Sequence, residues 1–299
     1  MIAVLLGVAL IAAQPVDSLR DKIEARVDRT PGAEAAVAYM DLHTGDTLFL
    51  NADTAFHAAS TMKVPVMIEI FRSAQAARIA MGQGIMLVNQ FASIVDGSRY
   101  SLDQDADGDT TLYRRLGQRV PIDTLLRLMI IRSSNLATNT LVALVGAPEV
   151  TTAMRRMGAE RIQVLRGVED GKAFDRGLVN TTSARDMAVI LRAIEEGRGI
   201  TPSDRQQMID ILLAQEFNQK IPAGVPRGTR VAHKTGEITS HSHDAAIVYP
   251  SSRRPYILVI LTRGVSSATV LDRLIADLSA LVYAHSTASA VANAAQPSR

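Results

Sequence analysis

Three short motifs in this 299-residue chain combine residue types that serve nucleophilic catalysis. Ser60 lies three residues before Lys63, Ser133 lies two residues before Asn135, and a Lys-Thr-Gly triplet begins at Lys234. A serine hydroxyl is a poor nucleophile until a neighbouring base removes its proton, and a lysine of lowered pKa can be that base. The motifs therefore predict a serine nucleophile with lysine partners.

The scarcity of lysine makes these motifs informative. With 20 serines and five lysines in the chain, about 0.3 Ser-x-x-Lys pairs are expected by chance, and a Lys-Thr-Gly triplet about 0.02 times. Ser-x-Asn is common in any sequence. Two of the five lysines, Lys63 and Lys234, fall inside the motifs, so the order of all three carries more weight than any one of them.

An apolar run of helical period follows Ser60, which predicts that this serine lies at the start of a helix. Unpaired backbone N–H groups and the helix dipole favour negative charge there. Lys63 lies one turn further along the same face and is the predicted base, if burial and Lys234 lower its pKa. The alternative is that Ser60 only caps the helix and Lys63 is a solvated helix residue.

The second motif follows the apolar helical run LLRLMIIR, where polar residues would interrupt a buried face. We expect a loop that points into a cleft, with Ser133 passing a proton to the leaving group and Asn135 holding a substrate amide. The alternative is an ordinary turn between helices, with Ser133 or Ser134 capping the next helix.

The third motif lies in an alternating run that predicts an edge strand beside the cleft. Lys234 would supply positive charge, Thr235 would hydrogen-bond a substrate carboxylate, and Gly236 would allow close backbone approach. The backbone N–H groups of Ser60 and Glu237 would form an oxyanion hole.

Both ends of the chain combine strands with a helix, whereas the middle is mostly helical in pattern. This predicts an α+β fold with an α/β lobe, built on an antiparallel sheet, from about 14–58 and 216–285, and an inserted all-helical lobe from about 59–215. A cleft between the lobes would bind the ligand. We expect the last helix to span about 268–284 and residues 286–299 to form a flexible tail.

Residues 2–13 form an apolar run that is too short for a membrane-spanning helix. We interpret residues 1–13 as a signal peptide cleaved after Ala13, so the mature protein would be exported without a stable membrane anchor. The alternative is a buried N-terminal strand or helix.

The absence of cysteine excludes disulfides, cysteine nucleophiles and thiolate metal sites. A formal net charge of +2 is too small to argue for nucleic acid as a partner. We expect a monomer that acts on a small molecule.

Ser-x-x-Lys, Ser-x-Asn and Lys-Thr-Gly in this order are the signature set of β-lactamases and penicillin-binding proteins. The chain resembles the class A β-lactamase family, and its broader set of related serine hydrolases, over nearly the whole mature length. Further stretches that carry the resemblance are AASTMKVPVM, MIIRSSNLATN, LRGVEDGKAFDRGLVNTTSARD and VAHKTGE. It implies the serine β-lactamase fold, a Ser60 acyl-enzyme that is then hydrolysed, and neither a metal nor an organic cofactor.

The chain departs from that family where deacylation is concerned. Class A enzymes carry a glutamate that positions the deacylating water, followed four residues later by asparagine. The matching region offers Glu169, but Ala173 stands four residues on. Our hypothesis is that Glu169 holds the water; the alternative is a surface acid paired with Arg166. Asn180 is a second candidate for water or substrate contact.

Two other groups of polar residues have less specific interpretations. His241, His243 and Asp244 follow the third motif and are interpreted as a hairpin flank or, alternatively, as part of a specificity rim. The acidic run 103–109 starts like a calcium loop, but its twelfth position is Arg114 where a glutamate is required. We therefore interpret this run as a solvated turn.

The sequence favours hydrolysis of β-lactam amides. A D-alanyl-D-alanine peptidase, amidase or esterase acting on a peptidoglycan-derived substrate would acylate through the same residues. A penicillin sensor that stays acylated, or a non-catalytic wall-binding domain, is the alternative from outside the hydrolases.

Overall fold

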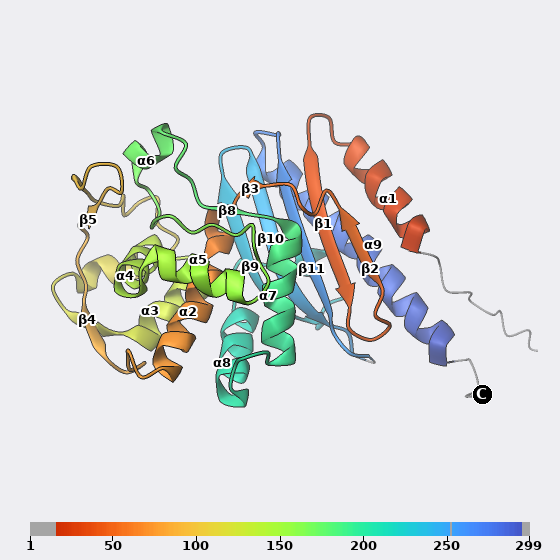
Figure 1. Cartoon of the computed structure of the whole chain (residues 1–299). Coiled ribbons are helices and arrows are strands. Elements are labelled where there is room, and N and C mark those ends of the chain that lie inside the picture. The colour runs from red at the N-terminus through yellow and green to blue at the C-terminus, as the bar shows by residue number, and fades with distance from the viewer. Residues whose placement is uncertain (1–15, 252, 295–299) are drawn as a thin grey trace, which may run out of the picture.

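The computed structural model describes residues 16–251 and 253–294, and it confirms the predicted α+β class. A five-stranded antiparallel sheet lies between two layers of helices, and a mostly helical region adjoins one edge of the sheet (Figure 1). The predicted N-terminal signal peptide lies outside the described residues. Within the described ranges, no helix combines the length and apolar character needed to cross a membrane.

The sheet joins strands from the two ends of the chain, in the order β2-β1-β11-β10-β9. The strands are β1 (Glu34–Asp41), β2 (Thr47–Leu50), β9 (Arg230–Ile238), β10 (His241–Tyr249) and β11 (Tyr256–Arg263). The predicted hairpin of β1 and β2 is confirmed, and β1 pairs with β11 from Glu34 opposite Arg263 to Asp41 opposite Tyr256. Strands β1 and β11 are buried on both faces, which explains their nearly continuous apolar runs. Strand β10 is equally buried, but its first four residues, 241–244, are polar.

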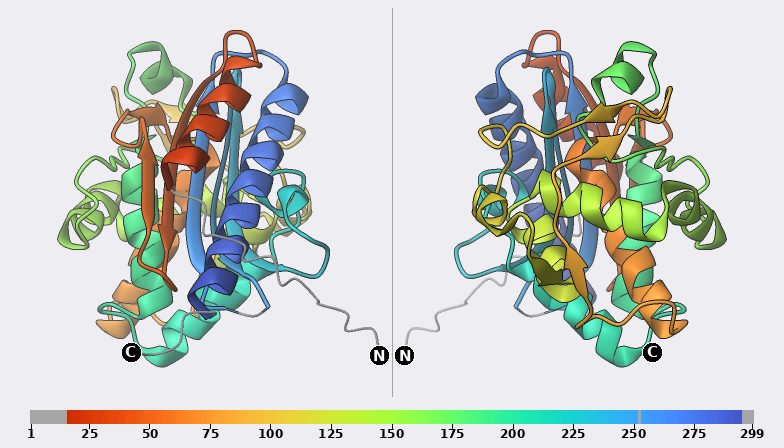
Figure 2. Two further views of the ribbon diagram at one scale, coloured as in Figure 1. Left: turned by 90° about the vertical axis from the view of Figure 1, so that its right-hand side faces the viewer. Right: turned by 90° about the vertical axis from the view of Figure 1, so that its left-hand side faces the viewer.

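One face of the sheet is covered by α1 (Val16–Asp28) and α9 (Ala268–Ala294), which lie side by side (Figure 2). Leu19 and Ile23 of α1 and Leu274 and Leu278 of α9 belong to the apolar core on this side. The expected end of the last helix near residue 284 is wrong, because α9 continues to Ala294. Its alanine-rich final turns have high helix propensity, so nine residues assigned to a flexible tail are helical.

The other face is covered by α7 (Ala184–Glu196), while α8 (Pro202–Leu213) packs beside β9. Both helices fall in the stretch predicted as the separate helical lobe. Met187, Ile190 and Leu191 of α7 share one continuous apolar core with sheet residues such as Val259. These residues form an apolar stripe along α7, which is stable only against another apolar surface, and the sheet provides that surface.

The helical region surrounds α2 (Lys63–Gln75), which is buried along almost its whole length. Its other helices are α3 (Ile122–Ile131), α4 (Asn135–Val145), α5 (Ala147–Arg156), α6 (Gly171–Asp175) and the 3-10 turn η2 (Thr111–Arg115). Two small ribbons that the sequence did not predict lie here, formed by β4 (Gly84–Met86) with β7 (Arg119–Pro121) and by β5 (Phe91–Ala92) with β6 (Arg99–Tyr100).

Short elements lie between this region and the sheet. Strand β3 (Phe56–His57) pairs with β8 (Thr181–Thr182). The 3-10 turn η1 (Ala59–Met62) follows β3 and packs against β9 and β10, and the 3-10 turn η3 (Ile221–Gly224) packs against α9. Strand β3 and η1 bring the predicted nucleophile to the edge of the sheet.

Candidate active site

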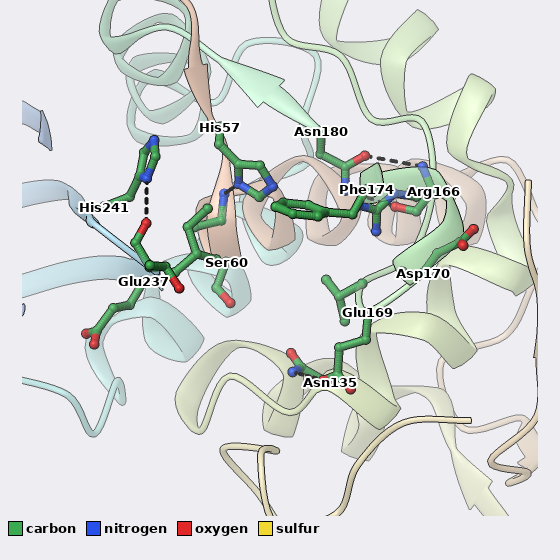
Figure 3. Close-up of a pocket in the computed structure, with 15 residues that line it drawn as sticks. His57, Ser60, Asn135, Arg166, Glu169, Asp170, Phe174, Asn180, Glu237 and His241 are labelled. Atoms are coloured by element: carbon green, nitrogen blue, oxygen red, sulfur yellow. Dashed lines mark hydrogen bonds between the residues drawn. The ribbon is translucent and has the colours of Figure 1, made fainter. Parts of the chain in front are cut away.

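Ser60 lies in η1, directly before α2 begins at Lys63, close to the predicted helix start. The residue before it, Ala59, has a φ of +45°, which is left-handed backbone that a residue with a Cβ adopts only under local constraint. Ser60 is half-buried and lines a cleft whose walls include Asn135, Glu169 and Glu237 (Figure 3).

The side chain of Lys63 is fully buried and reaches the second motif. Its Nζ donates to the carbonyl oxygen of Ser133 at 2.6 Å, to Ser133 Oγ at 3.0 Å and to Asn135 Oδ1 at 2.8 Å. The solvated-helix alternative for Lys63 is therefore wrong.

Lys234 approaches the same hydroxyl from the sheet. Its Nζ donates to Ser133 Oγ at 3.0 Å and to the carbonyl oxygen of Thr235 at 2.9 Å, and its side chain is fully buried. Ser133 itself lies between α3 and α4 and has a left-handed φ of +58°. The hydroxyl of Ser133 thus accepts from both motif lysines at once.

Burial controls the ionisation of these lysines. It lowers the pKa of Lys63 to about 7, although the negative charges of Asp107 and Glu169 oppose the shift. Burial also lowers the pKa of Lys234 well below its usual value, and the neighbouring charges of Lys63 and Lys220 lower it further. Desolvation disfavours an ammonium, so near neutral pH a large fraction of Lys63 is the free amine that a base requires.

Lys220, which the sequence analysis did not select, is a third buried lysine at this site. Its Nζ lies 3.4 Å from Glu237 Oε2, 3.4 Å from Asp272 Oδ1 and 3.5 Å from the carbonyl oxygen of Gly236. It lines a part of the cleft that also contains Ser60 and Thr235. Three of the chain's five lysines therefore converge here, and that scarcity was the one signal that could have drawn attention to Lys220.

The close backbone approach predicted at Gly236 is present. A Cβ added to Gly236 would lie 3.1 Å from the backbone N of Ser60 and 3.1 Å from that of Thr61. Strand β9 forms the edge of the sheet, as expected, so its residues border the cleft. Thr235 is buried, and the side chain of Glu237 is half exposed.

Asn135 begins α4, and the acidic run 103–109 holds it there. Asp107 accepts the backbone N–H of Asn135 at 2.8 Å and that of Leu136 at 2.9 Å, and Ser134 Oγ caps the same helix. The interpretation of the run as a solvated turn is wrong at Asp107 and Asp109, which are buried. A carboxylate at a helix N-terminus satisfies free N–H groups and interacts favourably with the dipole.

Glu169 is exposed and lies on the cleft wall with a left-handed φ of +62°. Its Oε1 accepts from Asn135 Nδ2 at 2.7 Å, and its Oε2 accepts from the backbone N of Asp103 at 3.2 Å. The expected alternative partner, Arg166, instead donates to the carbonyl oxygens of Leu178 and Gly167. Asn135 therefore connects Glu169 to Lys63 through both ends of its amide.

Asn180 also lines the cleft, but its side chain is used within the loop. Its Oδ1 accepts the backbone N–H groups of Leu165 and Arg166, and its Nδ2 donates to the carbonyl oxygen of Arg166. Asn180 therefore shapes the loop that carries Glu169.

The histidines near the third motif divide into buried and accessible ones. His243 and Asp244 are fully buried in β10, so they are not part of an exposed rim. His241 lines the cleft, together with His57 of β3, which the sequence analysis did not select, and Phe174 (Figure 3).

Comparisons with known proteins show the family of this chain. The model of a family described as "Beta-lactamase enzyme family" matches residues 18–286. A β-lactamase of Streptomyces albus G is 25% identical over 85% of this chain and 80% of its own length. The carbapenem-hydrolyzing β-lactamase KPC of Klebsiella oxytoca is 26% identical over 80% of this chain and 79% of its own length.

Solved structures show the same fold. A mutant of PBP-A, in an acyl-enzyme complex with penicillin G, superposes with a TM-score of 0.78 at 27% identity and covers 91% of this chain and 97% of its own. An ancestral class A β-lactamase gives a TM-score of 0.75 at 23% identity, with 89% of this chain and 99% of its own covered.

Proposed function

The chain belongs to the β-lactamase enzyme family, and from this premise we propose that it is a serine β-lactamase that opens β-lactam amides through an acyl-enzyme on Ser60. One observation carries the proposal. The buried amines of Lys63 and Lys234 both donate to the hydroxyl of Ser133, in the cleft that Ser60 lines. A nucleophile, a base and a proton relay thus meet in one place.

In the proposed acylation, Lys63 is a neutral amine that keeps two of its three hydrogen bonds and turns its lone pair to Ser60. It takes the proton of the Ser60 hydroxyl while Ser60 Oγ attacks the β-lactam carbonyl carbon. The carbonyl oxygen becomes an oxyanion, which would accept hydrogen bonds from the backbone N–H groups of Ser60 and Glu237; the close approach of β9 to η1 at Gly236 supports this role. The C–N bond then breaks, and Ser133 passes its proton to the leaving nitrogen and receives one from a neighbouring lysine.

Substrate recognition is proposed to use charge and amide contacts on either side of Ser60. Thr235 and Lys220 line the part of the cleft that contains Ser60, with Lys234 buried behind Ser133, and this group of polar and basic side chains is suited to the carboxylate that β-lactams carry. Asn135 would donate its amide to the acyl side chain once it gives up its bond to Glu169. Because Gly236 has no Cβ, β9 can lie close to the backbone of Ser60, so that both groups of contacts can reach one substrate.

In the proposed deacylation, Glu169 removes a proton from a water that attacks the Ser60 ester. Its place on the cleft wall and its link through Asn135 to Lys63 support this role. If the role is correct, Glu169→Gln should still be acylated by penicillin but should release the product far more slowly. Unchanged release would assign the water to another base.

The first experiment is hydrolysis of a chromogenic cephalosporin by the mature protein beside Ser60→Ala. Ser203→Ala, at an exposed serine in the first turn of α8, is the matched control. We expect steady turnover in the wild type and the control and none in Ser60→Ala. Equal turnover in Ser60→Ala would reject Ser60 as nucleophile.

A second candidate function is a penicillin-binding peptidase, amidase or esterase, or a sensor that stays acylated. The observation that favours it is Ala173, which stands where class A enzymes have an asparagine, four residues after the glutamate that positions the deacylating water. A single burst of cephalosporin opening, with a stable penicillin adduct on Ser60 by mass spectrometry, would support this candidate over the β-lactamase.

We also propose that the protein is exported to the periplasm or the extracellular space, where it would act as a monomer in resistance to β-lactams or in their breakdown. The apolar run of residues 2–13 supports a signal peptide cleaved after Ala13. N-terminal sequencing of the protein recovered outside the cytoplasm tests this, since a retained Met1 would contradict it. Light scattering tests the oligomeric state.

A further inference from the structure

We propose that two histidines, His243 and His57, form a relay of hydrogen bonds from β11 to the residue before Ser60 and thereby position the nucleophile. We call this chain of contacts, from Thr262 through His243 and His57 to Ala59, the histidine relay. The proposal rests on the proposed function of Ser60, but its geometry can be tested separately.

The first half of the relay lies inside the sheet. The backbone N–H of Thr262 in β11 donates to His243 Nδ1 at 3.2 Å, and His243 Nε2 lies 2.9 Å from the carbonyl oxygen of His57. Because Nδ1 accepts a hydrogen bond, the proton of the neutral ring must be on Nε2. His243 therefore donates to the backbone of His57 and fixes the end of β3 against the sheet.

The second half of the relay lies at the cleft. The backbone N–H of Ala59 donates to His57 Nδ1 at 3.0 Å, so the neutral ring of His57 also carries its proton on Nε2. This bond spans only two residues. It satisfies the amide of a residue whose left-handed φ of +45° is unfavourable for alanine.

The position of Ala59 explains why its conformation matters for chemistry. It is the last residue before Ser60, so its backbone angles decide where Ser60 Oγ and the Ser60 N–H point. On the other side, Thr61 Oγ1 donates to the carbonyl oxygen of Ala58 at 2.5 Å, and the N–H of Ala58 donates to the carbonyl oxygen of Asn180. These bonds fix the backbone at the start of η1. The bond to His57 fixes Ala59, whose left-handed φ changes the direction of the backbone before Ser60.

The relay requires both rings to be neutral, and their surroundings keep them so. Burial lowers the pKa of His57 to about 4, and the charges of His241 and Arg166 lower it further. Burial lowers the pKa of His243 to about 3, with His241 and Lys220 nearby, although its bond to the His57 carbonyl opposes the shift. Protonation would turn each Nδ1 from an acceptor into a donor and break the relay.

The test compares variants that remove or replace the acceptor at His57. His57→Phe keeps a ring but no acceptor, whereas His57→Asn keeps an acceptor near the place of Nδ1. Ala59→Gly removes the strain at Ala59, since glycine adopts a positive φ without a Cβ penalty. His43→Phe, at an exposed histidine in the turn after β1, is the matched control.

We expect His57→Phe to lower the second-order rate constant for acylation of Ser60 by penicillin about 10- to 100-fold, the scale of a misplaced reacting group. His57→Asn should keep most of the rate, and the double variant His57→Phe with Ala59→Gly should recover most of it. A merely structural role would lower the melting temperature without this pattern of rescue. An unchanged rate in His57→Phe, or no recovery in the double variant, would overturn the proposal.

A second measurement covers a variant that fails to fold. Nitrogen-15 NMR of histidine-labelled wild-type protein reports the tautomer of each ring, and we expect His57 and His243 both to carry the proton on Nε2 at pH 7. A proton on Nδ1 of either ring would overturn the relay. If penicillin and a fluorophosphonate both fail to label wild-type Ser60, the proposed function fails, while the NMR result still decides the relay.

Discussion

Two groups of buried charge in this molecule are built in opposite ways. Beneath the C-terminal part of α9, the side chains of Arg253 and Asp41 form an ion pair that is fully buried on both sides. In the cleft, the equally buried amines of Lys63 and Lys234 have as hydrogen-bond partners the hydroxyl, carbonyl and amide oxygens described above. The first group pairs opposite charges, whereas in the second no carboxylate among the described residues is hydrogen-bonded to either amine.

The difference appears in the ionisation of each group. Burial alone would raise the pKa of Asp41, but hydrogen bonds from Tyr39 and Arg253 outweigh it and lower that pKa, so the pair is held in its charged form. At the cleft, burial lowers the pKa of Lys63 and Lys234. A matched pair maintains the fold, whereas unmatched lysines lose protons readily and are suited to acid-base chemistry.

The largest expected effect comes from removing the proposed base. Lys63→Met should lower the rate of acylation about 10²- to 10⁴-fold, the usual contribution of general base catalysis. Stopped-flow measurement with a fluorescent penicillin gives the rate constant. A loss smaller than tenfold would mean that another group deprotonates Ser60.

The next effect concerns stability. Arg253→Met leaves Asp41 buried without its partner and should lower the free energy of unfolding by about 3–5 kcal/mol. Urea denaturation measures the loss, and acylation per folded molecule should not change. Adding Asp41→Asn to Arg253→Met should recover part of the stability, and a double variant less stable than the single one would contradict the matched-pair interpretation.

The lowered pKa of Lys63 predicts a smaller effect of pH. Acylation should rise with pH through about 7, as the free amine forms. Between this value and the ordinary pKa of 10.5, the unfolded chain binds more protons than the folded one, so stability should rise with pH. The slope from one such group is at most about 1.4 kcal/mol per pH unit. Lys63→Met should lose that part of the slope, and an unchanged slope would place the titration elsewhere.

The smallest effect is expected at the one α6 lysine, which lies outside the cleft lining. Lys172 is exposed and pairs with Asp96 at 2.8 Å, and exposed pairs contribute little because water and salt screen them. Lys172→Met should change cephalosporin turnover less than twofold. It is also the lysine control for Lys63→Met, because it makes the same side-chain replacement at a solvated position.

The sequence predicted the part of the site that depends on local spacing. Ser60 and Lys63 are one turn apart, so their spacing in the sequence is enough to predict that they lie close together. The meeting of the three motifs in one site was predicted from their order along the chain, which the family shares. Lys220 was missed because it is a single residue in an irregular segment between α8 and η3. Its place in the cleft follows from the packing of β9, which no local pattern shows.

Burial of polar residues was the other limit. Asp107 belongs to an acidic run that has the composition of a solvated turn, but its carboxylate accepts two backbone N–H groups at the start of α4. His57 belongs to no recognisable motif. Its contact with Ala59 depends on the left-handed backbone conformation of Ala59, which no sequence pattern predicts. Such roles follow from hydrogen-bond partners that appear only in three dimensions.

The pairing of β1 with β11 determines when the sheet can form during synthesis of the chain. Glu34 and Arg263, which bond across the two strands, are 229 residues apart in the chain. Because the chain is synthesised from its N-terminus, β1 can pair with β11 only after almost the whole chain has been made. Long-range strand pairing is also slow to form. Strand β9, which closes the site over η1, also arrives late. The nascent chain therefore passes most of its synthesis without a completed sheet or a competent nucleophile, and hydrolytic competence should appear abruptly once the last strand has docked.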